Sequence, residues 1–232
     1  MIPCLNEEEG MRQMIPRIDR GWCHQILVAD GQSHDGTVAY PREVGLEVYV
    51  QRGPGIRRAY VEAMGRVTGD IVITFSADGN CIPEVIPELI ARMREGYDMV
   101  IASRYFQGLK SEDDDLVTGF GNWLFTVLIN TLHGGTYSDP MNVFRAWRRE
   151  VFYRLDLHRE ETYAPERWFN TVIGLQPILS IRAAKARLRC AEIAGFEPAR
   201  IGGVRKLQVM RWGASYLAQI LRELVFWRPP RA

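Results

Sequence analysis

The sequence lacks the features that mark several common classes of protein. Its four cysteines, Cys4, Cys23, Cys81 and Cys190, are scattered along 232 residues. They form neither the close pairs that zinc sites need nor the framework of a small disulfide-rich secreted scaffold. The formal net charge is only +1, so there is no basic excess to attract a nucleic acid. We therefore expect reduced thiols, a cytoplasmic location and no nucleic-acid partner.

The sequence also lacks a long apolar run and a targeting segment. Its least charged stretch, residues 116–133, is interrupted by polar residues and falls short of the roughly 20 apolar residues that a membrane span requires. We expect a buried or interfacial helix there. Met1 is followed directly by Ile-Pro-Cys-Leu-Asn-Glu-Glu-Glu, without a basic start or an apolar segment, so no signal peptide is expected. The hydrophobic fraction of 47% is ordinary for a soluble globular protein.

What is present in the first hundred residues is an alternation of short apolar segments with helical ones. Strands are predicted at 26–29, 46–50, 71–75 and 99–102, and helices at 56–67 and 85–94. Such alternation predicts an α/β layer structure with a largely parallel sheet. The sheet would normally begin with a strand ahead of Pro3, where only Met1 and Ile2 stand, so we expect a truncated first strand.

The last part of the chain has a different pattern. Between residues 207 and 227, aromatic and aliphatic side chains recur at helical spacing, with arginines interspersed. We therefore divide the chain into a domain of residues 1–206 and a C-terminal amphipathic helix within residues 207–232. Aromatic and basic residues on such a helix suit a membrane interface. A helix packed on the domain, or on a second subunit of a homo-oligomer, explains the pattern equally well.

An aspartate follows the clearest of the predicted strands. It is Asp78, in the segment Ser76-Ala77-Asp78-Gly79-Asn80. Ligands of open α/β sheets bind outside the carboxyl ends of the strands, so Asp78 is expected at the mouth of a site. A carboxylate with a nearby amide or hydroxyl oxygen can hold Mg²⁺ or Mn²⁺. An aspartate in this position is also a common helix cap or turn former, so the segment alone does not decide between the two roles.

Two other segments are expected at the same edge of the sheet. Asp30 and Asp35 follow the first of the four predicted strands, where a carboxylate can accept hydrogen bonds from a base or a ribose. The alternative is that they simply form the turn. A glycine-rich loop after the next strand brings Arg57 or Arg58 to a position where either could meet a phosphate.

Taken in order, these segments resemble the family-2 glycosyltransferases of the GT-A fold over most of the chain. The family's opening Pro-x-x-Asn-Glu is matched by Pro3, Asn6 and Glu7. Its Asp-(Asp/Gly)-Gly-Ser-x-Asp-Gly-Thr element is matched by residues 30–37, with Gln32 where glycine is usual. Its Gly-Asp-strand-Asp-x-Asp element follows later in the chain and ends at Asp78.

Within the family, the sequence is most similar to the dolichol- and polyprenyl-phosphate sugar transferases. Their Gly-Ser-Arg-Tyr element appears as Ala-Ser-Arg-Tyr at 102–105, and their Asp-x-x-Ser-Gly-Phe-Arg element as Asp-Pro-Met-Asn-Val-Phe-Arg at 139–145. A late Glu-x-Pro…Arg-x-x-Gly-x-(Ser)-Lys element is echoed within residues 192–206. Ser76 stands where the family has the first aspartate of its metal motif.

The resemblance implies both a fold and an activity. The fold is GT-A, with a Rossmann-like, mostly parallel central sheet flanked by helices, here followed by the C-terminal amphipathic helical extension. The activity is a hexosyltransferase-like, metal-dependent and inverting transfer of a sugar from a nucleoside-diphosphate sugar to an acceptor. A polyprenyl phosphate at the inner face of a membrane is the expected acceptor. A soluble enzyme acting on a glycan or small-molecule hydroxyl, and a non-catalytic nucleotide-sugar-binding protein, stay open as alternatives.

The resemblance also implies a donor site with a metal. The residues expected to bind the nucleotide sugar are Pro3, Asn6, Glu7, Asp30, Ser33, Asp35, Arg58, Ala77 and Asp78. Mg²⁺ or Mn²⁺ is expected on Asp78, with Asn80 and Ser76 as weaker partners, and with the donor diphosphate contributing most of the charge. The metal would act as a Lewis acid that neutralises the departing diphosphate.

Basic residues are expected on the acceptor side of the site. Arg104 and Arg145 are predicted to bind an acceptor or donor phosphate, and Arg200 and Lys206 to close over it. The alternative for each of these residues is an ordinary surface charge.

The need for a base depends on the acceptor. A lipid phosphate is already nucleophilic, whereas a sugar hydroxyl needs a carboxylate to remove its proton. Asp139 is the expected base, with Glu166 behind it, so that Asp78, Asp139 and Arg145 are the predicted catalytic residues. The acidic loop at 112–115 is either a solvated loop or a mobile lid over the donor.

Overall fold

The structure is a computed structural model, and it describes residues 1–159, 162–198, 201 and 209–229. Arg200 and Lys206, two of the predicted phosphate-binding residues, lie outside the described residues. Among the described helices, none combines the length and the apolar character that crossing a membrane requires.

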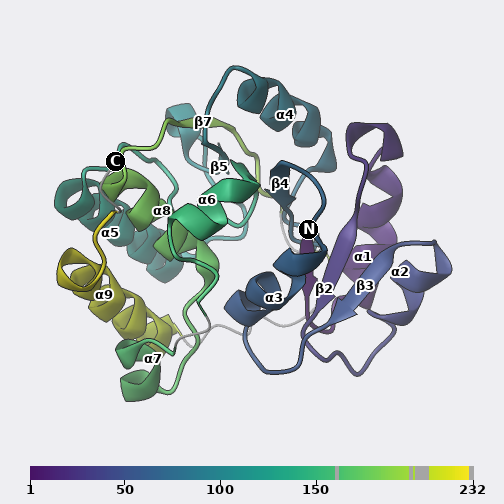
Figure 1. The fold of residues 1–232 in the computed structure, drawn as a ribbon, viewed down its shortest axis with the longest axis horizontal. Helices are drawn as coiled ribbons and strands as arrows, with labels where there is room; N and C mark the ends of the chain where they lie inside the picture. Colours follow the sequence, from purple (N-terminus) through teal and green to yellow (C-terminus); the bar gives the residue numbers. More distant parts are fainter. Residues whose placement is uncertain (160–161, 199–200, 202–208, 230–232) are drawn as a thin grey trace.

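In the described part of the chain, seven strands form a continuous α/β core (Figure 1). Three parallel strands pair in the order β1 (Ile2–Cys4), β2 (Leu27–Asp30) and β3 (Glu47–Val50). Four others pair in the order β4 (Ile71–Thr74), β6 (Arg145–Arg148), β5 (Met99–Ser103) and β7 (Cys190–Ala194). In this second group β6 is antiparallel to both of its neighbours, and β7 is parallel to β5.

Hydrogen bonds at Met1 join the two groups of strands. The amino group of Met1 donates to the carbonyl oxygen of Ile73 over 2.8 Å. The amide of Phe75 donates to the carbonyl oxygen of Met1 over 3.1 Å. Because β1 therefore lies beside β4, the segments that follow these two strands come out next to each other. The expectation of an α/β sheet flanked by helices is confirmed.

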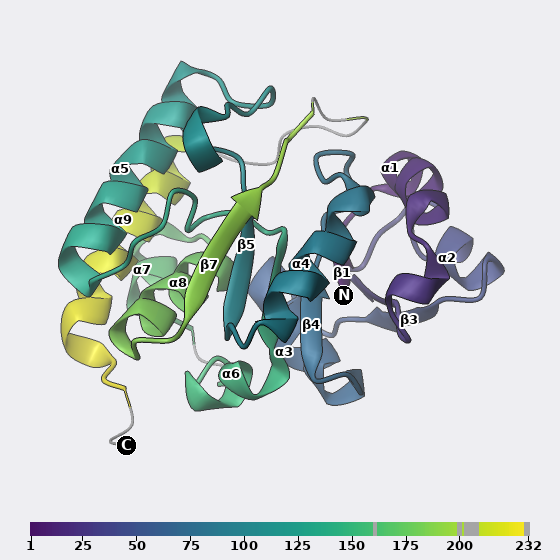
Figure 2. The same ribbon diagram turned by 90° about the horizontal axis from the view of Figure 1, so that it is seen from above.

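Helices flank the sheet along its length (Figures 1 and 2). Beside β1–β3 lie α1 (Glu8–Met14), α2 (Ala39–Glu43) and α3 (Ile56–Ala63). The β4–β7 part of the molecule carries the remaining described helices: α4 (Ile86–Arg94), α5 (Leu116–His133), α6 (Arg149–Arg154), α7 (Ala164–Phe169), α8 (Leu175–Lys185) and α9 (Val209–Phe226). Single 3₁₀ turns occur at Ile15–Arg17, Arg20–Trp22, Met64–Arg66, Pro83–Val85 and Phe106–Gly108.

The start and the end of the long helix α5 are each fixed by a capping residue. The side chain of Asp115 accepts hydrogen bonds from the amides of Val117 and Thr118, which caps α5 at its start. Thr118 completes a capping box by accepting from the amide of Asp115. The helix ends at Gly134, whose φ of 75° is the left-handed conformation that glycine adopts without steric cost.

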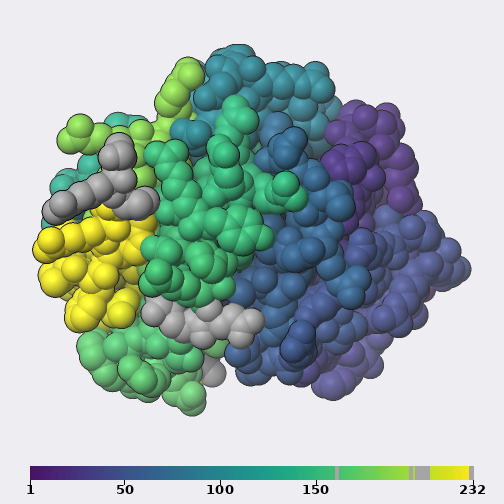
Figure 3. Space-filling view, viewed as in Figure 1, coloured from purple at the N-terminus to yellow at the C-terminus, as the bar shows by residue number. Residues whose placement is uncertain are grey.

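The C-terminal helix α9 packs onto the domain. Ile220 and Trp227 are buried in the same apolar cluster as the central Trp147, and Figure 3 shows α9, in yellow, lying directly against the green segments beside it. Arg182 of α8 and Glu223 of α9 form a buried ion pair, with Nε–Oε2 and Nη2–Oε1 distances of 3.1 and 3.2 Å. Contact of the remaining exposed face of α9 with a membrane or a second subunit stays a prediction.

Candidate donor site and metal centre

The segments that follow β1, β2 and β4 surround a pocket of about 260 Å³. It is lined by Asn6, Glu7, Glu8, Glu9, Gly10, Asp35 and Asp78. Three segments that are far apart in the sequence, and that the motif order predicts to meet, are thus brought together. A smaller, mainly apolar cavity of about 90 Å³ lies beside Met1 and Gly69, at the amino end of β4, and is not part of this site.

A glycine in α1 allows the first and last of these segments to touch. A Cβ atom at Gly10 would lie only 2.0 Å from the carbonyl oxygen of Ala77. No larger residue fits there without moving the backbone that carries Asp78. Gly10 is not among the predicted site residues, and its only signal in the sequence is a glycine inside the helical segment that follows Glu7.

The loop after β2 is held to the segment after β1 by several hydrogen bonds. Asp30 is buried, and its Oδ2 accepts from the amides of Gln32 and Ser33 over 2.9 and 3.0 Å. The hydroxyl of Ser33 accepts from the amide of Asn6, whose own Oδ1 accepts from the amide of His34. In the structure Asp30 and Ser33 therefore build the turn behind the pocket. Their predicted contact with a nucleotide is not tested by this geometry.

Asp35 contributes a charged carboxylate to the pocket. Desolvation favours its neutral form, but hydrogen bonds from Thr37 and from the amide of Glu8 outweigh this and hold the pKa of Asp35 below its ordinary value. Asp35 Oδ1 lies 2.9 Å from the amide of Thr37. The pocket is therefore strongly anionic at neutral pH, which favours a cation over a bare phosphate.

Asp78 lines the pocket, and Asn80 lies two residues beyond it, in contact with it. Only 9% of Asp78 and 8% of Asn80 is exposed. Asp78 Oδ1 accepts from the amide of Asn80 over 3.2 Å, and Asn80 Nδ2 donates to Asp113 Oδ2 over 3.3 Å. Asn80 Oδ1 is buried and has no hydrogen-bond partner among the residues that the structure describes. Ser76 lies two residues before Asp78 and is partly exposed.

These residues fit a divalent ion only as a mixed set of ligands. Within the described part of the chain, no three His, Cys, Asp or Glu side chains converge as a metal site. The carboxylate of Asp78 and the amide oxygen of Asn80 are nevertheless oxygen ligands of the kind that Mg²⁺ and Mn²⁺ prefer. A bound diphosphate would have to complete the set, as the sequence predicts.

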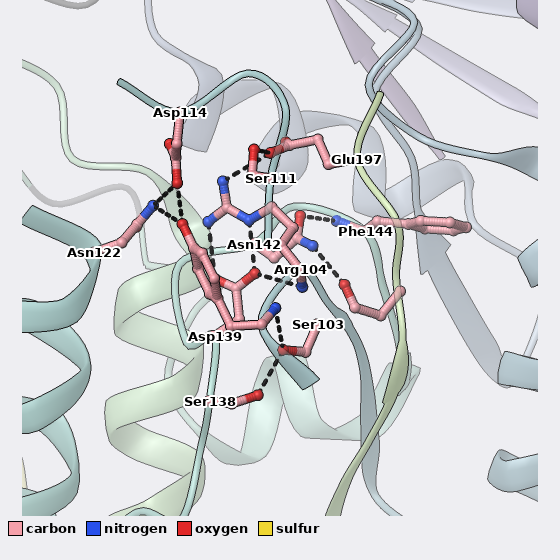
Figure 4. A network of polar contacts seen from close by, with 12 residues as sticks. Ser103, Arg104, Ser111, Asp114, Asn122, Ser138, Asp139, Asn142, Phe144 and Glu197 are labelled. Atoms are coloured by element: carbon pink, nitrogen blue, oxygen red, sulfur yellow. Dashed lines mark hydrogen bonds and ion pairs between the residues drawn. The ribbon is translucent and has the colours of Figure 1, made fainter. Parts of the chain in front are cut away.

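Arg104 and Asp139 form a two-pronged ion pair at the carboxyl end of β5 (Figure 4). Arg104 Nε lies 2.7 Å from Asp139 Oδ2, and Arg104 Nη2 lies 2.8 Å from Asp139 Oδ1. Burial lowers the pKa of Arg104, but Asp139 and Glu197 raise it well above its ordinary value, so the guanidinium stays charged. Both oxygens of Asp139 are engaged by Arg104, so in this structure Asp139 positions an arginine rather than facing a hydroxyl.

Glu192 and Glu197 hold this ion pair in place, and neither is among the predicted site residues. Glu192 accepts hydrogen bonds from the amides of Ser138 and Asp139. Glu197 accepts from Arg104 Nη1 over 3.4 Å and from the hydroxyl of Ser111. Burial raises the pKa of Glu197, although Arg104 and Ser111 partly offset this. The only sequence signal for these two carboxylates is their place in the late Glu-x-Pro element.

Arg145 needs a correction. The sequence predicts that it binds phosphate and takes part in catalysis, but the structure buries it completely at the start of β6. Its guanidinium donates to Ser180 Oγ over 2.9 Å, to the carbonyl oxygen of Pro140 over 3.0 Å and to that of Asn142. Burial lowers the pKa of Arg145 to about 10. The side chain points into the core because β6 is an inner strand, so Arg145 braces the loop of Asp139 from behind.

The predicted residues of the glycine-rich loop are also engaged elsewhere. Arg57 and Glu166 form a buried ion pair, with Nη2 lying 2.8 Å from both carboxylate oxygens. Glu166 also accepts from the amides of Tyr163 and Ile173, so it holds α7 against α3 and is not placed to act as a base. Arg58 is exposed, and its Nε lies 3.5 Å from Glu62 Oε1. It does not line the pocket.

Comparison with known proteins gives the family. Residues 1–156 match the family model described as glycosyl transferase family 2. The chain belongs to this family. The sequence-based identification of a family-2 glycosyltransferase is therefore confirmed.

Two curated relatives illustrate its place within the family. Undecaprenyl-phosphate 4-deoxy-4-formamido-L-arabinose transferase of Klebsiella pneumoniae is 28% identical over 178 residues, which cover 71% of this chain and 53% of the relative. Dolichol-phosphate mannosyltransferase of Pyrococcus furiosus is 28% identical over 170 residues, covering 68% of this chain and 48% of the relative. The chain spans about half the length of the curated relatives it matches. The family-2 chain is thus close in sequence to polyprenyl-phosphate sugar transferases.

Solved structures confirm the fold. Glucosyl-3-phosphoglycerate synthase of Mycobacterium tuberculosis, in complex with phosphoglyceric acid, superposes with a TM-score of 0.72 at 20% identity, covering 100% of this chain and 80% of that one. Its complex with Mn²⁺, UDP-glucose and phosphoglyceric acid gives a TM-score of 0.68 at the same identity, with 100% and 79% covered. At this identity the likeness shows the GT-A fold alone.

Proposed function

We propose that this family-2 chain is an inverting, metal-dependent glycosyltransferase that moves a sugar from a nucleoside-diphosphate sugar to a polyprenyl phosphate. The observation that carries the proposal is the pocket in which Asp78 meets Asn6, Glu7 and Asp35, with the buried amide oxygen of Asn80 beside it. Relatives whose names specify undecaprenyl phosphate and dolichol phosphate support the acceptor. Neighbouring structures that hold Mn²⁺ with UDP-glucose support the donor and the metal.

We assign the following roles to the chain's own residues. Asp78 and Asn80 would hold a divalent ion, which supplies charge neutralisation to the departing diphosphate when it is bound. Asp35 and Glu7 keep the pocket anionic, so that the diphosphate binds only together with a cation. Arg104, held rigid by Asp139 and Glu197, is the basic residue that we expect an incoming phosphate to meet.

The engaged carboxylates favour a phosphate acceptor over a hydroxyl. A hydroxyl acceptor needs a base, and both predicted bases are committed to arginines, Asp139 to Arg104 and Glu166 to Arg57. A lipid phosphate carries its own oxyanion and needs none. We therefore retain the phosphate acceptor and set the hydroxyl acceptor as the alternative to be tested.

Binding of the donor is tested by thermal shift. The protein is heated with UDP-, GDP- and dTDP-sugars, each with and without Mn²⁺. A donor at about 100 times its Kd stabilises the folded state by about 2.7 kcal/mol, which raises the Tm by roughly 5–10 °C for a chain of this size. We expect this rise with one base and only when Mn²⁺ is present. No rise with any nucleotide sugar would contradict the proposal.

An exposed apolar stripe on α5 fits an acceptor that is dissolved in a membrane. Leu116, Phe120, Trp123 and Val127 recur at helical spacing and all are exposed, Phe120 by 61% and Trp123 by 58%. The stripe starts directly after the acidic loop, whose Asp113 contacts Asn80, two residues beyond the pocket residue Asp78. A lipid phosphate could therefore enter the site from a bilayer on which α5 rests.

This membrane contact predicts that Phe120→Ser/Trp123→Ser binds phospholipid vesicles roughly 10- to 100-fold more weakly than the wild type, because two apolar side chains no longer enter the bilayer. The measurement is flotation of the protein with the vesicles on a density gradient. Tyr153→Ser on α6 removes an aromatic side chain that is 50% exposed away from the stripe, and should leave flotation unchanged. If the double variant floats like the wild type, α5 is not the membrane contact. Light scattering then shows whether the stripe joins two copies of the chain.

A further inference from the structure

The acidic loop between the turn at Phe106–Gly108 and α5 is anchored to the rest of the molecule at successive residues. The amide of Glu112 donates to the carbonyl oxygen of Glu197 over 3.1 Å. The hydroxyl of Tyr105 donates to Asp114, and Asp115 caps α5. Each of these residues thus has a structural role within the loop. Asp113 differs from them because its side chain reaches the metal segment.

The contact that Asp113 makes is with Asn80. Asn80 Nδ2 donates to Asp113 Oδ2 over 3.3 Å, and the amide of Asp113 donates to the hydroxyl of Ser111 over 3.2 Å. Asn80 in turn donates its backbone amide to Asp78. The carboxylates of Asp78 and Asp113 therefore both contact Asn80, Asp78 at its backbone amide and Asp113 at its side-chain amide.

The oxygen of that amide points to a ligand. Asn80 is more than nine-tenths buried, and Asn80 Oδ1 has no hydrogen-bond partner among the described residues. Leaving a buried acceptor unsatisfied costs about 1–3 kcal/mol, so such an atom in a folded protein calls for an explanation. A cation that takes Asn80 Oδ1 as a ligand satisfies this atom, and the carboxylates of Asp78 and Asp113, which both hydrogen-bond to Asn80, balance its charge.

The metal motif of this chain has one carboxylate fewer than the motif of the family it resembles. Ser76 stands where the family resemblance places an aspartate, so the segment after β4 brings one carboxylate, Asp78, instead of two. A divalent ion next to a diphosphate is held more firmly by two carboxylates than by one. The structure offers a second carboxylate next to Asn80. It belongs to Asp113, in a different part of the chain.

We infer that Asp113 is a metal-binding residue that supplies, from the loop before α5, the carboxylate that Ser76 does not. This inference rests on the proposed function, because it assumes that Asp78 and Asn80 hold a divalent ion. It gives the acidic loop a definite role, since the loop completes the metal site and does not merely lie in solvent.

The inference is tested by Mn²⁺ binding to the whole chain, measured by calorimetry with Mn²⁺ alone and with Mn²⁺ plus UDP, GDP or dTDP. We expect Asp113→Asn to weaken Mn²⁺ binding by at least about ten-fold. Glu112→Gln is the matched control, since it removes the same charge from the neighbouring exposed residue, and it should stay within about two-fold of the wild type. If both variants lose the same amount of Mn²⁺ affinity, the loss comes from the lower negative charge of the loop and not from a ligand at Asp113, and the inference is overturned.

A compensating variant gives a second and independent measurement. Restoring a carboxylate at the family position, in Ser76→Asp/Asp113→Asn, should bring Mn²⁺ affinity back to within about three-fold of the wild type. Failure of this variant to recover, with its Tm unchanged, would speak against an equivalent role for the two positions.

The outcome also separates this inference from the proposed function. If Asp78→Asn abolishes Mn²⁺ binding while Asp113→Asn has no effect, the metal site stands and the role of Asp113 is refuted. If the wild type binds no Mn²⁺ even with UDP, GDP or dTDP present, the metal-dependent function fails, and the role of Asp113 fails with it.

Discussion

Asp78→Asn is expected to lower the rate of sugar transfer by about two to three orders of magnitude. The substitution keeps the shape of the side chain and removes its charge, so the divalent ion loses its first carboxylate. Removing one group that stabilises charge in a transition state typically costs a factor of about 100 to 1000. The rate is measured with the donor that the thermal-shift screen identifies, at saturating Mn²⁺.

Asp70→Asn is the matched control for this variant. Asp70 precedes β4 whereas Asp78 follows it, and its side chain is 95% exposed, so the same charge is removed from the opposite end of the same strand. We expect its rate to stay within about two-fold of the wild type. If Asp78→Asn retains full activity, the proposed metal centre is wrong. If neither the wild type nor the variant transfers sugar, yet both bind nucleotide equally well, the chain is a nucleotide-sugar-binding protein without catalytic activity.

Glu223→Ala is expected to lower the free energy of unfolding by about 3–5 kcal/mol. The ion pair between Arg182 and Glu223 is almost fully buried, with side-chain exposures of 2% and 0%. Removing the carboxylate leaves the charge of Arg182 uncompensated in the core, which is among the most costly changes a protein can undergo. Since domains of this kind are stable by only about 5–15 kcal/mol, urea-induced unfolding should show the loss clearly.

Two further variants separate the ion pair from other causes. Glu88→Ala removes an exposed glutamate from α4, and should change stability by no more than about 0.5 kcal/mol. Arg182→Met/Glu223→Leu replaces the pair with apolar side chains and should recover most of the loss, since it leaves no buried charge. A Glu223→Ala protein as stable as the Glu88→Ala control would show that the ion pair does not fasten α9 to α8.

The strands could be predicted from the sequence where an apolar run is bounded by turn-forming residues. Segments predicted at 26–29, 46–50, 71–75 and 99–102 correspond to β2, β3, β4 and β5 within one residue at each end. The strand β6 could not be predicted, because Arg-Ala-Trp-Arg carries a charge at both ends and has no apolar periodicity. It is a strand because β4 and β5 lie on either side of it and supply the hydrogen bonds.

The site could be predicted as a set of segments but not as a set of contacts. The order of motifs predicts that the segments of Asn6, Asp35 and Asp78 meet, and all three residues line one pocket. The prediction was possible because each segment follows a strand, and these strands end at the same edge of the sheet. It could not show that Asp139 pairs with Arg104, or that Arg145 turns into the core. Those outcomes depend on which side chains from distant segments meet, and a linear pattern carries no such distances.

The antiparallel insertion of β6 between β4 and β5 has a consequence for how the chain is made. β1 to β3 precede the other strands along the chain, so all three can leave the ribosome and pair first, whereas β4 and β5 leave before β6, the strand that joins them. Until Arg148 has emerged, both keep an unpaired edge, and their apolar segments are exposed in the nascent chain. A translational pause or a truncation between residues 103 and 145 would therefore leave a half-built sheet that is prone to aggregate and in need of a chaperone.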